Sequence, residues 1–200
     1  MALKNIKSGG IVASQVETES AKLLIEKLQL QPHIEGGYFV ETDRSRDLVA
    51  NPYYNNNSNN NNNNNNNNNE DQDRHRSFST LIYYLLTSVS PIGRFHRNKS
   101  RTIHLLHQGR ARYVVIHPDG ELETFTVGHD VANGEKLQWI VEGGDYKASF
   151  LISNEECLIS EVVVPGFDYK DHNFMSSRDE LVGLIGEERA SEWDWLLRPN

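Results

Sequence analysis

The 200-residue sequence has a single cysteine, Cys157, and lacks long hydrophobic runs. One cysteine excludes an intrachain disulfide and any zinc site built from several cysteines, and it fits a reducing compartment. The longest apolar run is Leu81 to Leu86, far short of the roughly 20 residues that span a bilayer. Residues 1–20 are polar and have no apolar segment typical of a secretion signal. We therefore expect a cytoplasmic protein with no membrane partner.

Positive charge is also scarce, because 20 Lys and Arg stand against 28 Asp and Glu, a formal net charge of −8. General nucleic-acid binding relies on a large positive field, so we expect no nucleic-acid partner. One basic stretch lies between Pro91 and Pro118. Its members are Arg94, Arg97, Lys99, Arg101, Arg110 and Arg112. The stretch is either a solvated strand face or dimer rim, or an anchor for an anionic ligand, because arginine binds phosphate oxygens in pairs.

Asparagine dominates one segment, where it fills fourteen of the fifteen positions from Asn55 to Asn69. Such a polar tract cannot offset its ordering entropy, so we expect a disordered insertion at about residues 47–76. A prion-like interaction segment is the alternative. The rest predicts one domain over residues 18–200 after a flexible N-terminus of residues 1–17.

The residue pattern predicts a mostly β fold. A helical apolar spacing starts at Thr18 and ends near Leu30. Short runs rich in Val, Ile, Tyr, Phe and Thr then recur, separated by turn residues. The nine expected strands are Gly37–Thr42, Phe78–Thr87, Gly93–His96, Thr102–His107, Ala111–His117, Glu121–Val127, Leu137–Val141, Tyr146–Ile152 and Leu158–Val164. Two C-terminal helices are expected at about Ser177–Ile185 and Glu187–Leu197. So many strands favour a rolled sandwich or barrel, which hides its edges.

Five motifs, in this order, resemble a small single-domain branch of the cupin superfamily that has no assigned activity. They are Glu35–Thr42 (EGGYFVET), Ser79–Leu86 (STLIYYLL), Phe95–Asn98 (FHRN), His117–Gly120 (HPDG) and Ser160–Phe167 (SEVVVPGF). The resemblance spans roughly residues 22–184. It implies an all-β fold, the double-stranded β-helix or jelly-roll barrel, with a ligand pocket inside and usually a homodimer. It does not imply a reaction, because cupins host many chemistries.

The same resemblance argues against the usual cupin metal site. A typical first motif supplies His-x-His and Glu, whereas these positions here hold His96, Asn98 and Thr102, and Lys147 stands where the second motif has a histidine. His104 and His107 cannot replace them, because residues three apart on a strand point to opposite faces. Loss of the ligands favours loss of the site, so we expect no metal and no cofactor.

Three residues are the catalytic candidates. Glu161 shares a strand face with apolar residues, so it is either an activated carboxylate inside the barrel or a structural ion-pair partner. His96 is either a general base or an inert remnant of the metal site. Tyr83 is either a proton donor or plain core.

The ligand-binding candidates come from the same motifs. They are Tyr38, Glu41, Thr80, Asn98, Arg97 and Lys147. After the last strand, Asp168 or Asp171 with His172 suggests an acid–base dyad, or only a polar loop. Glu35-Gly36-Gly37 is interpreted as a backbone feature, because glycine permits positive φ.

These residues leave three functions open. The first is a metal-free isomerase or epimerase acting on a small anionic ligand that resembles a sugar or nucleotide. The second is a cupin that binds a metabolite without turning it over. The third, a metal-dependent oxygenase or decarboxylase, is supported only by His96.

Overall fold

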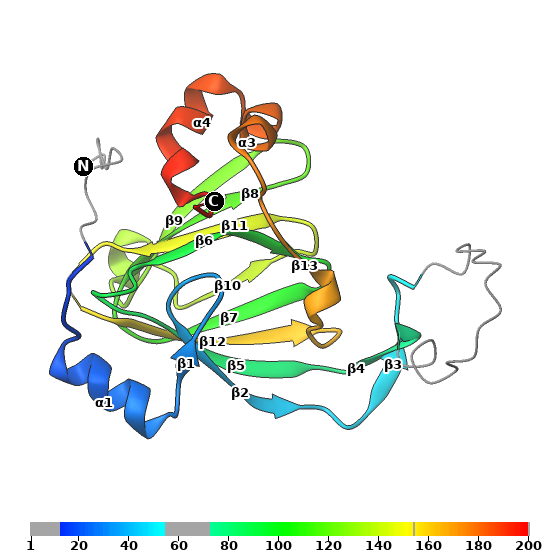
Figure 1. The fold of residues 1–200 in the computed structure, drawn as a ribbon, viewed down its shortest axis with the longest axis horizontal. Coiled ribbons are helices and arrows are strands. Elements are labelled where there is room, and N and C mark those ends of the chain that lie inside the picture. The colour runs from blue at the N-terminus through cyan, green and yellow to red at the C-terminus, as the bar shows by residue number, and fades with distance from the viewer. Residues whose placement is uncertain (1–12, 55–72, 154, 200) are drawn as a thin grey trace.

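The computed structural model describes residues 13–54, 73–153 and 155–199. Two antiparallel sheets face each other and enclose the core (Figure 1). The larger sheet has the strand order β1-β2-β5-β12-β7-β10 and the smaller has the order β13-β6-β11-β8-β9. A separate pair, β3 with β4, lies at the base of the asparagine tract. The expected all-β jelly-roll architecture is confirmed.

The strands of the larger sheet are β1 (Gln31–Pro32), β2 (Tyr38–Arg44), β5 (Thr80–Leu86), β12 (Cys157–Val164), β7 (Arg101–Gln108) and β10 (Gln138–Val141). Those of the smaller sheet are β13 (His172–Phe174), β6 (Ile92–Asn98), β11 (Tyr146–Leu151), β8 (Ala111–Ile116) and β9 (Leu122–Val127). The separate pair is β3 (Leu48–Ala50) and β4 (His75–Ser77), and short 3-10 turns lie at Val131–Asn133, Tyr169–Asp171 and Asp194–Leu196.

Alternation along the strands separates three apolar clusters. Between the sheets lie Tyr84, Tyr113, Phe125, Trp139 and Ile159 with their neighbours. The outer face of the smaller sheet packs against helices α3 (Arg178–Ile185) and α4 (Glu187–Trp193), which lie over it in Figure 1. The outer face of the larger sheet packs against α1 (Glu19–Lys27). Residues two apart on one strand therefore reach the same layer, and their neighbours reach another.

The helices begin where the sequence predicts. Thr18 caps α1 by accepting a hydrogen bond from the Ala21 backbone N–H at 3.0 Å. Ser177 caps α3 in the same way through Glu180. Each cap satisfies a backbone donor that has no partner within its helix. None of the helices in the described residues is long and apolar enough to cross a membrane.

The flanks of the asparagine tract differ from the expectation. Strands β3 and β4, which the sequence pattern does not predict, pair within the region expected to be disordered. The buried Arg76 on β4 donates from Nε to Asp171 at 2.9 Å and thereby joins this hairpin to the barrel. The tract itself, residues 55–69, lies outside the described residues, as do most residues of the expected flexible N-terminus.

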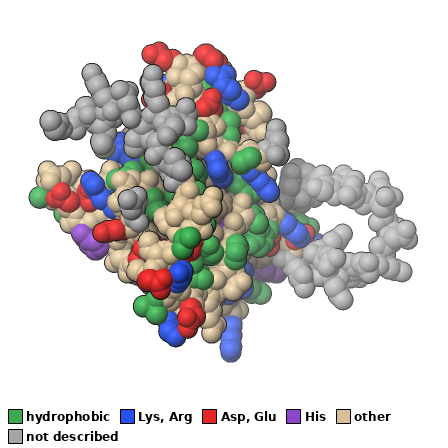
Figure 2. All heavy atoms as spheres, turned by 60° about the vertical axis from the view of Figure 1, so that its left-hand side comes forward, with side chains coloured by type: hydrophobic (Ala, Val, Ile, Leu, Met, Phe, Trp, Pro, Cys, Tyr) green, Lys and Arg blue, Asp and Glu red, His purple; other side chains and the backbone are tan. Residues whose placement is uncertain are grey.

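The surface carries mixed charge. Figure 2 shows acidic and basic side chains interspersed over the face that it draws. Four of the six members of the basic stretch are exposed, which supports the solvated-face interpretation: Arg97, Lys99, Arg101 and Arg110. Its members also have separate partners. Arg94 donates to the Trp195 carbonyl, Arg112 donates to Thr124 and Thr126, and Lys99 pairs with Asp171.

Candidate functional site

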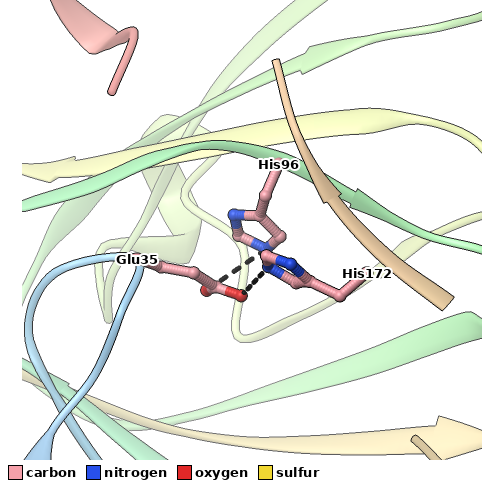
Figure 3. Close-up of side chains that lie close together, drawn as sticks. All are labelled: Glu35, His96 and His172. Carbon is pink, nitrogen blue, oxygen red and sulfur yellow. Dashed lines mark hydrogen bonds and ion pairs between the residues drawn. The ribbon is translucent and has the colours of Figure 1, made fainter. Parts of the chain in front are cut away.

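Three side chains from distant parts of the chain converge inside the fold (Figure 3). Glu35 comes from the loop between β1 and β2, His96 from β6 and His172 from β13. Glu35 Oε1 lies 2.8 Å from His172 Nε2, and Glu35 Oε2 lies 3.2 Å from His96 Nε2. The two imidazole rings are nearly parallel, with centroids 5.2 Å apart. We call these three residues the histidine group.

Backbone geometry brings Glu35 to this position. Gly36 has φ +103°, and a Cβ there would lie 2.0 Å from the Ile92 carbonyl oxygen, so only glycine lets the loop approach β6 so closely. The Arg94 N–H donates to the Glu35 carbonyl at 2.8 Å, and Tyr84 Oη donates to the Gly36 carbonyl at 2.9 Å. The predicted role of the paired glycines is confirmed, and their consequence is the placement of Glu35.

The histidine group combines an ionised carboxylate with a neutral imidazole. Burial acts to raise the pKa of Glu35, but His96, His33 and the hydrogen bond from His172 outweigh it and hold that pKa well below its ordinary value. Burial lowers the pKa of His96 to about 4. The Glu35 carboxylate acts to raise this pKa, and the Lys147 ammonium acts to lower it. At neutral pH the His96 ring is therefore uncharged.

A second group lies beside the first. Lys147 on β11 donates from Nζ to Glu161 Oε2 on β12 at 2.7 Å and to His104 Nε2 on β7 at 2.8 Å. All three side chains are buried. His104 also stacks on Trp139, with ring centroids 5.0 Å apart. We call Lys147, Glu161 and His104 the lysine group.

The two groups are neighbours because Lys147 and His96 are register partners on β11 and β6. Directly opposite residues of an antiparallel pair send their side chains to the same face. Burial acts to raise the pKa of Glu161, but Lys147 and His104 outweigh it and lower that pKa. Burial and Lys147 both lower the pKa of His104. The interior thus brings the carboxylates of Glu35 and Glu161 together with the Lys147 ammonium and with His96 and His104, whose pKa values are lowered.

The predicted residues divide between faces. His96, Glu161 and Lys147 are buried on the inner side of the sheets, a placement that the sequence left open. Tyr83 and Tyr38 instead pack against the α1 cluster on the outer face of the larger sheet. Tyr83 stands edge-on to His107 at 5.6 Å, and Tyr38 Oη donates to Glu17 at 3.0 Å.

The remaining predicted ligand-binding residues have individual surroundings. Glu41 is exposed and pairs with Arg44. Thr80 is buried, and its Oγ1 accepts a hydrogen bond from the Phe167 N–H at 2.9 Å. Arg97 is exposed and lies over the Tyr146 ring. Asn98 shares the face of His96, and its Oδ1 has no hydrogen-bond partner among the described residues.

Three residues of the site were missed or assigned another role. Glu35 is the acid beside His172, whereas Asp171 faces Arg76 and Lys99. His104 and His107 do point to opposite faces, but His104 alone joins the lysine group, while His107 Nε2 lies 2.6 Å from Ser160 Oγ. The one signal for Glu35 was its position beside two glycines, and the signal for His172 was its acidic neighbour.

Glu35, His96 and His172 also have the donor types of a metal site. Each offers one ligand atom, and these atoms lie within 4.8 Å of one another. The set shares only His96 with the usual cupin frame, whose remaining positions Asn98, Thr102 and Lys147 contribute nothing to it. The expectation of no metal therefore rested on a different set of residues.

Comparison with known proteins agrees with the fold. The model of DUF985, a family of the cupin superfamily, matches residues 22–175. The uncharacterized protein YML079W of Saccharomyces cerevisiae is 50% identical over 181 residues, which cover 88% of this chain and 86% of the yeast protein. A hypothetical protein from Leishmania major matches with a TM-score of 0.71 at 28% identity, over 89% of this chain and 99% of that one.

Protein SO0799 from Shewanella oneidensis has the same fold, with a TM-score of 0.70 at 24% identity over 93% of this chain and all of that chain (100%). The motifs, the two facing sheets and the match over most of the sequence agree. This chain belongs to the cupin superfamily, in the family DUF985.

Proposed function

We propose that this chain binds a small anionic metabolite inside its barrel and moves a proton on it, as an isomerase or epimerase does. The observation that carries the proposal is the lysine group, in which one buried ammonium bonds both a carboxylate and an imidazole. General acid–base catalysis needs a proton donor and a proton acceptor within hydrogen-bond reach of the same substrate. Lys147 can donate a proton, and Glu161 can accept one when a substrate displaces the ion pair that lowers its pKa.

The lysine group also has a means of binding an anion. An ammonium has three N–H donors, and among the described residues Glu161 and His104 take two of those of Lys147. The third can donate to a carboxylate or phosphate oxygen of a ligand. A charged hydrogen bond of this kind is stronger in a buried site than in water.

The surroundings favour a ring-containing or polyhydroxy ligand. One face of Trp139 stacks on His104 and Tyr113 stands edge-on to both rings, so the lysine group lies beside an aromatic wall of the kind that contacts sugar and base rings. Asn98 Oδ1 supplies an acceptor without a partner among the described side chains. We retain a metabolite-binding protein without turnover as the alternative, because the same features would serve binding alone. The expected homodimer and cytoplasmic location remain predictions.

A thermal-shift screen of the purified chain tests binding. Sugar nucleotides, nucleotides and small organic acids are added, and a ligand that binds the native state raises the melting temperature. We expect at least one anionic compound to stabilise the protein at millimolar concentration. No stabilisation by any of these classes would contradict the proposal.

Incubation of the identified ligand with the protein in D₂O then separates turnover from binding. We expect deuterium in the recovered ligand, detected by mass spectrometry, with wild type and with Glu123→Gln, an exposed carboxylate that pairs with Lys136. Glu161→Gln should stop the exchange, because an amide cannot accept the proton. Binding without exchange in wild type would establish the alternative, a storage or sensing role.

A further inference from the structure

We propose that Glu35, His96 and His172 bind one divalent first-row transition-metal ion through a carboxylate oxygen and two Nε2 atoms. These residues form a site that the usual cupin ligand positions do not supply. The site stands on its geometry, and it would also deepen the function proposed above.

The hydrogen bond of His96 fixes which of its nitrogens is free. Nδ1 lies 2.8 Å from the Arg94 carbonyl oxygen. A carbonyl only accepts, so Nδ1 carries the proton that faces it, and Nε2 is the ring nitrogen left to bind a metal. In metal sites, a backbone carbonyl often accepts a hydrogen bond from the histidine nitrogen that does not bind the metal, and this bond orients the ring.

The free lone pair faces another acceptor. His96 Nε2 is buried, lies 3.2 Å from Glu35 Oε2 and has no hydrogen-bond partner in the described part of the chain. Two acceptors that face each other in a dry interior are unfavourable, and His96 Nε2 has no donor of its own, whereas His33 Nδ1 also lies 3.5 Å from the same Glu35 oxygen. A cation between them would satisfy both.

The distances suit such a cation. Bonds from a transition metal to nitrogen or oxygen are about 2.0–2.2 Å, so two ligand atoms at right angles lie about 3 Å apart. Glu35 Oε2 lies 3.2 Å from His96 Nε2, and Glu35 Oε1 lies 2.8 Å from His172 Nε2. The second contact is a hydrogen bond, so His172 releases its Nε2 proton when the ion binds. One ligand atom from each residue lies within 4.8 Å of the other two. Two histidines and one carboxylate leave further coordination positions open for a ligand.

The site also bears on the function proposed above. Lys147 is the register partner of His96, so a divalent cation held by the histidine group would add positive charge beside the Lys147 ammonium. An anionic ligand would then meet both positive charges. This part of the argument rests on the proposed function.

Metal titration without any organic ligand tests the site. The full chain is dialysed against a chelator, and Co²⁺ is then added while visible absorption and isothermal calorimetry are recorded. We expect one ion per chain, the absorption bands of cobalt bound to nitrogen and oxygen ligands, and a raised melting temperature. Zn²⁺ and Mn²⁺ are titrated in the same way.

Variants locate the ion. Glu35→Gln and His172→Gln should each weaken binding at least about 100-fold, because each removes a ligand. His129→Gln, an exposed histidine elsewhere, should bind as wild type does. Circular dichroism identifies a variant that fails to fold, and the other variant then decides.

Wild type that takes up no stoichiometric ion would overturn the proposal and leave an imidazolium–carboxylate pair as the explanation of the contact. Equal binding by wild type and both folded variants would also overturn it. Either result leaves the ligand screen and the exchange experiment untouched, so failure of the metal site is distinct from failure of the proposed function.

Discussion

Removal of the Lys147 charge should expose how strongly the interior depends on its ion pair. Lys147 and Glu161 are 4% and 7% exposed, and their charged atoms lie 2.7 Å apart. Lys147→Met leaves the Glu161 carboxylate buried without its ammonium. Breaking a buried pair in this way costs about 3–5 kcal/mol, which lowers the melting temperature by roughly 6–20 °C in a domain of this size.

The pH dependence gives the prediction its sign. In wild type the pKa of Glu161 is lowered below its unfolded value, so the pair stabilises the fold above pH ~4.3 and this stabilisation is lost as the pH falls. In Lys147→Met only His104 still opposes the effect of burial, so the pKa of Glu161 rises. The deficit of the variant should therefore be largest near neutral pH and shrink toward pH ~4.

Urea unfolding of wild type, Lys147→Met and the double variant Lys147→Met/Glu161→Leu measures these free energies. The double variant should recover at least half of the loss, because it removes the carboxylate that was left unpaired. A loss below about 1 kcal/mol in Lys147→Met, or a double variant less stable than the single one, would refute the reasoning.

Two further predictions concern the backbone and the thiol. Gly36→Ala should lower the free energy of unfolding by at least about 2 kcal/mol, because the residue has φ +103° and its new Cβ would meet the Ile92 carbonyl. Gly183→Ala, in open space on α3, should raise it by about 0.5–1 kcal/mol. Equal urea midpoints of the two variants would contradict this. Cys157 should resist a thiol reagent in the native state and react on unfolding, because burial raises its pKa to about 12; rapid labelling of folded protein would show the strand to be open.

The main strands could be predicted because their alternation is strong. Each of the nine expected strands overlaps an observed one, from β2 to β12, and Thr18 and Ser177 cap the helices that their neighbours predict. Strands β1, β3, β4 and β13 are only two or three residues long, too short for a periodic signal. They are recognised only once their partners in the sheets are known.

The residues of the candidate site were also predictable to different degrees. The two-residue period shows which strand neighbours share a face with Lys147, His96 and Glu161, but it left open whether that face is the inner one. Glu35 and His172 could not be joined, because 137 residues separate them and the pairing depends on how the β1–β2 loop crosses β6. His104 was set aside with His107 because their spacing excluded a shared site, although a lone inward histidine can still join residues of other strands.

The fluorescence of Trp139 tests most directly whether a ligand binds between the two groups. Trp139 stacks on His104 inside the barrel, whereas Trp193 and Trp195 pack with the C-terminal helices. In the variant Trp193→Phe/Trp195→Phe, a stabilising ligand should change the emission of Trp139 in a saturable way, with the dissociation constant that calorimetry gives. A ligand that raises the melting temperature but leaves this emission unchanged would place its binding outside the barrel and contradict the account.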